Sequence, residues 1–175
     1  MQNNDKIGAI FFSDKIEKFI PPKKGKKHVL HIIRELLVLE TESPKTNISE
    51  ALKYFTNAIK KSSTAFIISD FMDDAFRHSL LIANRKHDVS AIQVYDARES
   101  EIPNVGIMKL KDAETGERIL VDTSDKRTRK SYKLQWNERQ LELLKIFKQC
   151  GVDSEIMNTE EDYVKMLLRL FRLRN

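Results

Sequence analysis

Residues 63–74, S-T-A-F-I-I-S-D-F-M-D-D, combine a short apolar run with a group of hydroxyl and carboxylate side chains. This run, A-F-I-I, is short and bounded by polar residues, which is typical of a strand buried on both faces of a parallel sheet. Because open α/β sheets place ligand sites at the carboxyl ends of strands, Ser69 and Asp70 are candidates for a ligand edge. Asp73 and Asp74 can start the next helix. Short polar residues also favour turns and caps, so a purely structural role stays open.

Apolar spacing and turn residues predict alternating strands and helices around this stretch. The expected elements are strands over 6–12 and 16–20, helices over 24–39 and 48–59, the strand 65–68, a helix over 74–86, a strand over 89–95, a hairpin of 105–111 and 117–122, a long helix, a strand over 152–157 and a last helix. Asn47 and Glu50 have the spacing of a helix amino cap with its reciprocal carboxylate. Strand, helix and strand in succession imply a right-handed parallel crossover, so the sequence predicts an α/β layered sheet.

Glycines and prolines indicate where these elements turn or end. Pro21 and Pro22 suit an edge strand, because proline cannot donate to a strand ladder. Gly116 is available for a left-handed position in the hairpin turn, and Gly151 should end the long helix. Residues 98–104 have the mixed acidic and basic character of a loop.

The composition limits the classes of protein to which this chain can belong. The chain has 175 residues, and we expect one domain over 1–175. Lys plus Arg number 31 against 26 Asp plus Glu, a formal net charge of +5, which falls short of a concentrated nucleic-acid footprint. The single Cys150 rules out an internal disulfide and fits a reducing compartment. No apolar run approaches the ~18 residues of a membrane span, so we expect a cytoplasmic protein.

The most basic stretch is 126–133, which has only one aromatic residue, Tyr132. Such a run is usually a solvated helix face, because surfaces that bind single strands combine basic residues with stacking aromatics. A nucleic-acid-binding basic α/β domain stays open as an alternative, and a steep fall of affinity with salt would be its signature.

Five blocks in chain order carry a specific resemblance. They are K-I-G-A-I-F-F-S-D-K-I-E-K-F-I-P-P from residue 6, F-I-I-S-D-F from 66, H-D-V-S-A-I-Q-V-Y-D-A-R-E from 87, D-A-E-T-G-E from 112, and G-V-D from 151 with T-E-E-D-Y-V from 159. Together they resemble the bacterial family called domain of unknown function fifty-eight, which is von Willebrand factor A-like. The resemblance covers essentially the whole chain.

The resemblance implies a Rossmann-like, von Willebrand factor A-type sheet with helices on both faces, and a metal-ion-dependent adhesion site at its carboxyl edge. It also implies a non-enzymatic role in protein interaction, often beside a MoxR-type AAA+ ATPase. In such sites D-x-S-x-S, a threonine and an aspartate supply oxygen ligands, which suit Mg²⁺. By position Thr46 resembles the threonine and Asp70 the aspartate, with Ser69 and Asp73 along the same ligand edge.

The D-x-S-x-S element has no counterpart in this sequence. The chain starts just before the segment that resembles the family's second strand, so we expect a fold that lacks the first strand and helix. Lys45 stands where the family often has a glycine. We therefore expect no bound cofactor, with Mg²⁺ binding only if the missing motif is supplied. Without the first strand, the strands at 6–12 and 65–69 either pair directly or leave two apolar edges open. We expect open edges, with self-association or a poorly soluble monomer as the result.

A metal-dependent hydrolase is the enzyme alternative, with Asp70, Asp73, Asp74 and His78 as its cluster. The sequence has no H-E-x-x-H, G-x-S-x-G, G-x-G-x-x-G or phosphate-binding G-x-x-x-x-G-K-[ST] motif, so catalysis is poorly supported. Two further histidines, at positions 28 and 31, have the spacing of neighbours on one helix face but no third metal ligand nearby.

Overall fold

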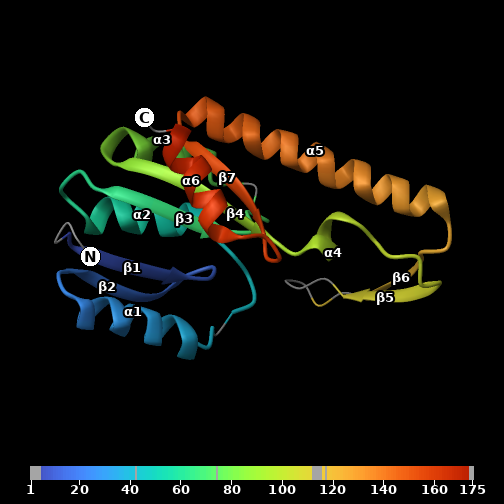
Figure 1. Ribbon diagram of the computed structural model, residues 1–175, viewed down its shortest axis with the longest axis horizontal. Coiled ribbons are helices and arrows are strands. Elements are labelled where there is room, and N and C mark those ends of the chain that lie inside the picture. The colour runs from blue at the N-terminus through green and yellow to red at the C-terminus, as the bar shows by residue number, and fades with distance from the viewer. Residues whose placement is uncertain (1–4, 42, 74, 112–115, 117, 174–175) are drawn as a thin grey trace. The chain divides into compact units, whose positions relative to one another are not determined.

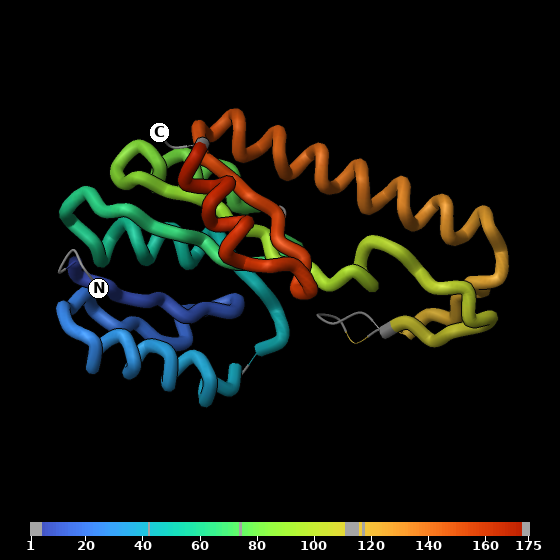
Figure 2. The backbone as a smooth tube through the Cα atoms, viewed as in Figure 1, coloured from blue at the N-terminus to red at the C-terminus, as the bar shows by residue number. Residues whose placement is uncertain are grey.

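The computed structural model describes residues 5–41, 43–73, 75–111, 116 and 118–173. The chain divides into two compact units, one of residues 1–60 with 73–80 and the other of residues 61–72 with 81–175. Figure 2 traces the backbone through both units. Each unit combines strands and helices and is described by itself, and the expectation of a single domain stays a prediction.

The first unit begins with a hairpin. β1 (Ile7–Phe12) pairs antiparallel with β2 (Ile16–Lys23), in a register that sets Ala9 opposite Ile20. Gly8 lets the two backbones approach closely, since a Cβ there would lie 2.8 Å from the Ile20 carbonyl oxygen. Among the described residues β2 pairs only with β1, so it is the predicted edge strand, and it continues through both of its prolines.

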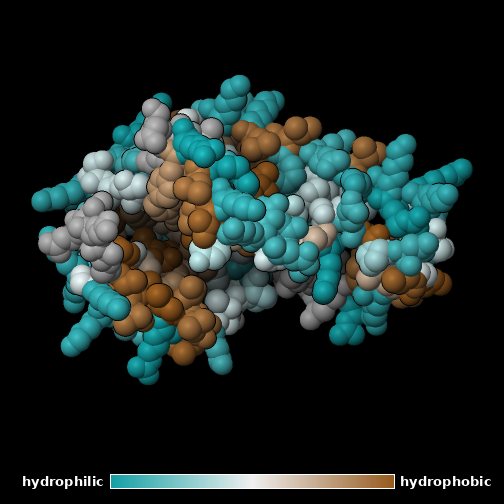
Figure 3. Space-filling model, in the orientation of Figure 1, coloured by the Kyte–Doolittle hydropathy of each residue, from teal (hydrophilic) through white to brown (hydrophobic). Residues whose placement is uncertain are grey.

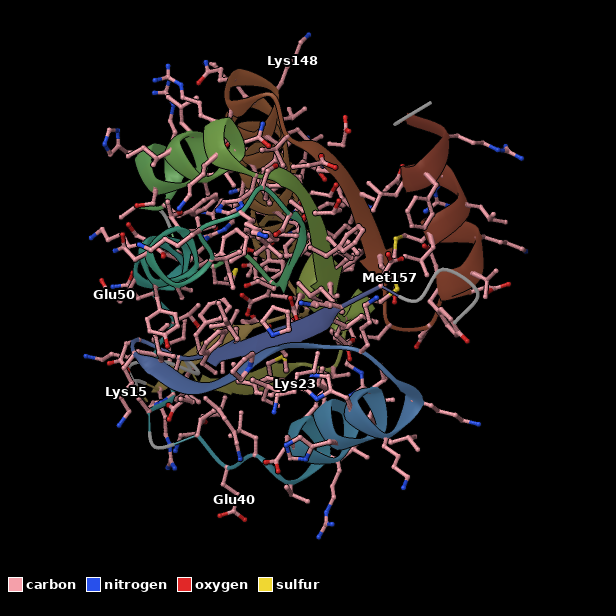
Figure 4. The ribbon with its side chains drawn as sticks, turned by 90° about the vertical axis from the view of Figure 1, so that its left-hand side faces the viewer. Lys15, Lys23, Glu40, Glu50, Lys148 and Met157 are labelled. Carbon is pink, nitrogen blue, oxygen red and sulfur yellow. The ribbon has the colours of Figure 1, made fainter. Side chains whose placement is uncertain are left out.

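α1 (Lys26–Val38) follows the hairpin. None of its residues is buried, and Leu37 is 79% exposed. An ion pair between Glu35 and Lys18 ties the helix to β2, and the hydrogen bond from Lys18 lowers the pKa of Glu35. Figure 4 shows the helix beneath Lys23, the last residue of β2.

α2 (Ile48–Ala58) begins where the sequence predicts. The Asn47 side chain accepts a hydrogen bond from the Glu50 N–H over 2.9 Å, which confirms Asn47 as the amino cap. The helix packs against the hairpin, where Tyr54 meets Phe19 of β2 edge to face with ring centroids 5.6 Å apart.

The second unit is built on a parallel sheet with the strand order β3-β4-β7. Its strands are β3 (Thr64–Ser69), β4 (Asp88–Tyr95) and β7 (Asp153–Asn158). β4 is central, and five consecutive residues, 89–93, are buried, so both faces of this strand are covered. Figure 1 shows helices beside the sheet, and the predicted α/β class with a parallel sheet is confirmed in this form.

β3 is an edge strand, which corrects the prediction of a strand buried on both faces. Among the described residues it pairs with β4 alone. Its side chains alternate between half-buried and exposed, with Phe66 42% and Ile68 63% exposed. The reason is that a short apolar run predicts a strand, while its place in the sheet depends on segments far away along the chain.

α6 (Tyr163–Leu173) packs on one face of the sheet. Met166 and Leu170 of this helix form a core cluster with Ile92 of β4. Met157, near the carboxyl end of β7, packs against the cluster, as Figure 4 shows. The apolar side of the last helix therefore holds the second and third strands of the sheet together.

α5 (Lys126–Cys150) is the longest helix among the described residues. The Asp125 side chain caps its start, and Gly151 ends it in the left-handed conformation with φ 66°, as predicted. Leu143 and Phe147 are buried, so the carboxyl-terminal half of the helix carries its core contacts.

α3 and α4 differ from the sequence predictions. α3 (Arg77–Lys86) starts at Arg77 and not at Asp74, which lies outside the described residues. α4 (Ala97–Ser100) is a short helix in a segment predicted as a loop. Asp96 and Glu99 form a capping box at the start of this helix. The D-x-x-E spacing in the sequence is typical of such a helix start.

The predicted hairpin between α4 and α5 is present. β5 (Ile107–Lys111) pairs antiparallel with β6 (Arg118–Asp122). Gly116 has φ 73°, the left-handed conformation expected in this turn. Thr123, fully buried, anchors the hairpin by donating its hydroxyl to the Gly106 carbonyl over 2.6 Å.

Candidate functional site

The candidate site is the turn that follows β3, at the carboxyl end of the parallel sheet. Ser69 Oγ accepts a hydrogen bond from the Phe71 N–H over 3.1 Å, and Asp70 Oδ1 accepts one from the Met72 N–H over 3.1 Å. The Ser69 hydroxyl also donates to Asp70 Oδ1 at 3.4 Å. Both predicted residues therefore shape the turn, the structural role that the sequence left open.

Phe71 is held in an unusual backbone conformation. Its φ is 56°, the one positive value at a non-glycine position among the described residues, and only 2% of the residue is exposed. A left-handed conformation costs a residue with a Cβ about 1–2 kcal/mol. The Phe71 ring meets Phe147 of α5 edge to face at 5.1 Å, and Arg139 donates to the Phe71 carbonyl oxygen at 3.3 Å. Burial and hydrogen bonds thus fix a strained turn.

Gln93 fixes the turn from the neighbouring strand. It lies opposite Ser69 in the sheet, and its Nε2 donates to the Asp70 carbonyl oxygen over 3.2 Å. Gln93 is only 3% exposed, and its Oε1 has no hydrogen-bond partner among the described residues. Sequence reasoning missed Gln93 and Phe71, and the one signal for the glutamine was a polar residue inside an apolar strand.

Asp70 and Met72 are the exposed members of this turn. Asp70 Oδ1 accepts the turn hydrogen bonds, while its Oδ2 has no partner among the described residues. The carboxylate therefore keeps one oxygen for a cation or for a hydrogen-bond donor, on a backbone that cannot easily move. Asp70 thus follows the carboxyl end of β3, where α/β sheets place ligand sites, and its ligand role stays a prediction.

Asp73 belongs to the first unit and makes a different contact. Its Oδ2 accepts a hydrogen bond from the Ile48 N–H over 2.8 Å, and its Oδ1 accepts one from the Ala75 N–H over 2.9 Å. The carboxylate thus caps the amino end of α2, where negative charge is stabilising. Both oxygens serve the fold, and a ligand role for Asp73 stays a prediction.

Thr46 lies just before α2 in the same unit as Asp73. It is half-buried, and its hydroxyl has no hydrogen-bond partner among the described residues. Asp70 belongs to the other unit, so the predicted pairing of Thr46 with Asp70 stays a prediction. No described group of three or more His, Cys, Asp or Glu residues could hold a metal ion.

Comparison with known proteins gives the family. A model of the family described as "Protein of unknown function DUF58" matches residues 1–142. This chain belongs to the DUF58 family. The resemblance read from the five sequence blocks is therefore confirmed at the level of the family.

Two of the curated relatives of this DUF58 chain are longer proteins. An uncharacterized protein of Mycobacterium bovis and one of Mycobacterium tuberculosis are each 23% identical over 175 residues, 97% of this chain and 54% of theirs. An uncharacterized protein of Mycobacterium avium is 26% identical over 129 residues, 73% of this chain and 76% of its own length. The DUF58 chain spans about half the length of the first two relatives.

Two solved structures share the fold. One is the conserved hypothetical protein BatB from Bacteroides thetaiotaomicron, with a TM-score of 0.59, 15% identity, and coverage of 98% of the DUF58 chain and 79% of its own. The other is an aerotolerance-related membrane protein from Bacteroides fragilis, with a TM-score of 0.54, 14% identity, and coverage of 97% and 81%. At this identity the likeness concerns the fold alone.

His28 and His31 of the DUF58 chain have local partners. His28 Nε2 lies 2.9 Å from the Ile7 carbonyl oxygen, and His31 Nδ1 lies 3.5 Å from a carboxylate oxygen of Glu35. His78, the histidine of the hydrolase alternative, is exposed, and Asp74 of that cluster lies outside the described residues.

The basic stretch forms the first turns of α5. Arg129 donates to the Thr123 and Ser124 carbonyl oxygens, the second at 3.0 Å, and Lys133 pairs with Glu101. These contacts use two of the basic side chains within the DUF58 fold itself, and the choice between a solvated helix face and a nucleic-acid surface stays a prediction.

None of the described helices of the DUF58 chain combines the length and the apolar character needed to cross a membrane.

Proposed function

We propose that this DUF58 chain is a non-enzymatic protein-interaction module of von Willebrand factor A type. The observation that carries the proposal is the rigid turn after β3, which presents Asp70 with a free Oδ2 at the carboxyl end of a parallel strand. Interaction sites need a preformed surface more than they need acid–base groups, and a buried, strained turn supplies one.

The von Willebrand factor A arrangement is part of this proposal. Its support is the parallel order β3-β4-β7, with both faces of β4 covered. The fold likeness to the BatB protein, at a TM-score of 0.59, adds to it. In such a Rossmann-like sheet the strand ends form the binding edge.

Mg²⁺ enters the proposal only where the D-x-S-x-S motif that this sequence lacks is supplied, and the resemblance then implies Thr46 and Asp70 as candidate ligands. Each has an oxygen without a partner among the described residues, and both oxygens are the hard donors that Mg²⁺ prefers. A bound ion would offer an open coordination position to a carboxylate of a partner. Two donors are fewer than the six that Mg²⁺ takes, so without the missing motif we expect no bound ion.

The partner we propose is a MoxR-type AAA+ ATPase, which the family resemblance implies. Asp70 carries negative charge, so a direct contact would pair it with a basic or N–H-rich surface of the partner, whereas a metal-mediated contact would use an acidic one. Cys150 is buried and forms no disulfide among the described residues, which fits a reducing compartment, so the proposal includes a cytoplasmic location.

Binding of the full chain to a MoxR-type ATPase tests this function. Biolayer interferometry, with and without MgCl₂, compares the wild type with Asp70→Ala and with Glu142→Ala, an exposed carboxylate on α5. We expect Asp70→Ala to weaken binding at least about tenfold, which is the loss of one charge-assisted contact, and the control to leave it unchanged. Absence of binding, or equal binding by both variants, would contradict the proposal.

A further inference from the structure

α5 has an outward face that its contacts with the sheet leave open. Its inward face is fixed by Trp136, which meets Tyr95 of β4 with ring centroids 5.3 Å apart, and by the buried Phe147. Because an α-helix completes a turn in about 3.6 residues, Leu134 and Leu141 lie on the opposite side of the helix. Both of these leucines are exposed. The second unit therefore presents one face of a long helix that its own core does not use.

Three leucines on the outward face have the spacing of a coiled-coil seam, and we call them the leucine stripe. Leu134, Leu141 and Leu144 are 50%, 69% and 41% exposed. With Leu134 as position a of a heptad, Leu141 is the next a and Leu144 the next d, and Asn137 occupies the d between them. Figure 3 shows apolar atoms along α5 with hydrophilic side chains between them. The stripe is narrow, as in a contact between two helices, whereas helices that lie in a lipid surface carry a broader apolar face.

The charges around the leucine stripe are mostly positive. One carboxylate, Glu138, lies one turn from both Leu134 and Leu141. Five exposed basic side chains of α5 make no ion pair or side-chain hydrogen bond among the described residues, and these are Lys126, Arg127, Lys130, Lys145 and Lys148. Such a surplus of one sign attracts groups of the opposite sign on a partner. The stripe thus combines apolar contact positions with a basic surround.

We propose that the leucine stripe docks an amphipathic helix of another protein, with apolar side chains on its contact face and acidic side chains beside them. Packing of the two helices removes the exposed leucines from water, which stabilises the pair. The basic side chains of α5 meet the carboxylates of the partner and contribute direction and rate of association more than affinity. Asn137 sets the register, because its amide needs a hydrogen-bond partner once it is buried. This surface is separate from the Asp70 turn and does not rest on the function proposed above.

A second copy of the chain does not fit the leucine stripe. In an antiparallel pair of α5 helices with Leu134 of each copy opposite Leu144 of the other, Lys130 of each copy faces Lys148 of the other. In a parallel pair each lysine faces the same lysine of the other copy, so like charges destabilise both arrangements. Nucleic acid fits less well than a helix, because leucines provide no aromatic surface on which bases stack. The pattern therefore selects an acidic helix as the occupant.

Fluorescence anisotropy with a labelled synthetic peptide tests the docking site on the full chain. The probe has about four heptads with leucine at a and d and glutamate at e and g, so that its own charge opposes pairing with itself. A second peptide with lysine in place of glutamate is the charge control. We expect the acidic peptide to bind the wild type, with an affinity that falls as salt is added, and the basic peptide not to bind.

Variants at exposed leucines locate the contact. Leu141→Gln should raise the dissociation constant of the acidic peptide at least about tenfold, because an amide would be buried among leucine side chains. Leu120→Gln on β6, where the leucine is 74% exposed, is the matched control and should bind as the wild type does. Asp70→Ala should also bind the peptide unchanged, which separates this surface from the turn after β3. Far-UV circular dichroism checks that the variants fold.

Several results would overturn the docking site. They are a wild type that binds neither peptide, equal binding of the acidic and the basic peptide, and an affinity that Leu141→Gln leaves unchanged. Vesicles of anionic lipid and single-stranded DNA are measured in the same assay as competitors. If either binds the wild type more tightly than the acidic peptide does, the occupant belongs to another class and the proposal fails.

Discussion

The backbone N–H of Ile48 donates a hydrogen bond to Asp73 Oδ2 over 2.8 Å, so a carboxylate from 25 residues further along the chain caps α2. Asn47 caps the same helix end locally, through the Glu50 N–H. Two acceptors of different origin thus satisfy the free N–H groups of a single helix start. The hydrogen bond from Ile48 therefore gives Asp73 a structural role that does not depend on any ligand.

Asp73→Ala should lower the free energy of unfolding by about 1–2 kcal/mol, the range for loss of a helix-capping acceptor. Urea denaturation followed by circular dichroism measures the change. Asp73→Asn keeps an acceptor oxygen and should retain most of the stability. Equal stability of the alanine variant and the wild type would show that the Ile48 contact contributes nothing.

Substitutions at Phe71 should reveal the backbone strain. Phe71→Ala loses the contact with Phe147 and should cost about 3–5 kcal/mol. Phe71→Gly loses the same contact but relieves the left-handed strain, so it should be more stable than the alanine variant by about 0.5–1 kcal/mol. Chemical denaturation of the two variants under identical conditions gives the order. The usual order, with alanine more stable than glycine, would rule out strain at this position.

Asn84 should be the most costly polar residue to replace in the second unit. Its Nδ2 donates to the carbonyl oxygens of Cys150 and Gly151, at 3.0 and 2.8 Å, and its Oδ1 accepts from the Val89 N–H at 3.1 Å. Asn84→Ala removes all three bonds and should cost about 2–4 kcal/mol in urea denaturation. Asn137→Ala, at an exposed position on α5, is the matched control and should change stability by less than about 0.5 kcal/mol.

His87 should make stability depend on pH. Burial, followed by the charge of Lys86, lowers the pKa of this histidine, which is 4% exposed. Between the lowered folded pKa and the unfolded value near ~6.5, the unfolded chain binds more protons, so stability rises with pH in this window. Urea denaturation at several pH values should therefore show wild-type stability falling as the pH drops below ~6.5.

The matched variants His87→Gln and His78→Gln separate this effect from other titrations. His87→Gln should flatten the pH dependence, while His78→Gln, at an exposed position, should keep the wild-type profile. A profile that His87→Gln leaves unaltered would assign the pH dependence to other groups.

The features of the fold that depend on neighbouring residues could be predicted from the sequence. The cap at Asn47, the left-handed Gly116 and Gly151, and the apolar runs of the strands depend on residues within a few positions of one another. Their spacing therefore predicted the order and type of most elements. The missed helix α4 carried the same kind of signal, in the spacing of Asp96 and Glu99.

The candidate site could be predicted only in part from the sequence. Ser69 and Asp70 were placed at the end of a strand because a polar pair follows an apolar run, and the structure places them there. Gln93 and Phe71 were not identified, since the hydrogen bond and the ring contact that fix the turn come from β4 and α5. No spacing within residues 63–74 contains that information.

The sequence by itself therefore determined the local elements and the family of this chain, because hydrophobic period, caps and glycine conformations act over a few residues. The tertiary structure alone decided that β3 is an edge, that Asp73 caps α2 and that Phe71 accepts a left-handed backbone. Each of these depends on a contact between segments distant along the chain, and the free energy of such a contact is set by packing and not by local propensity.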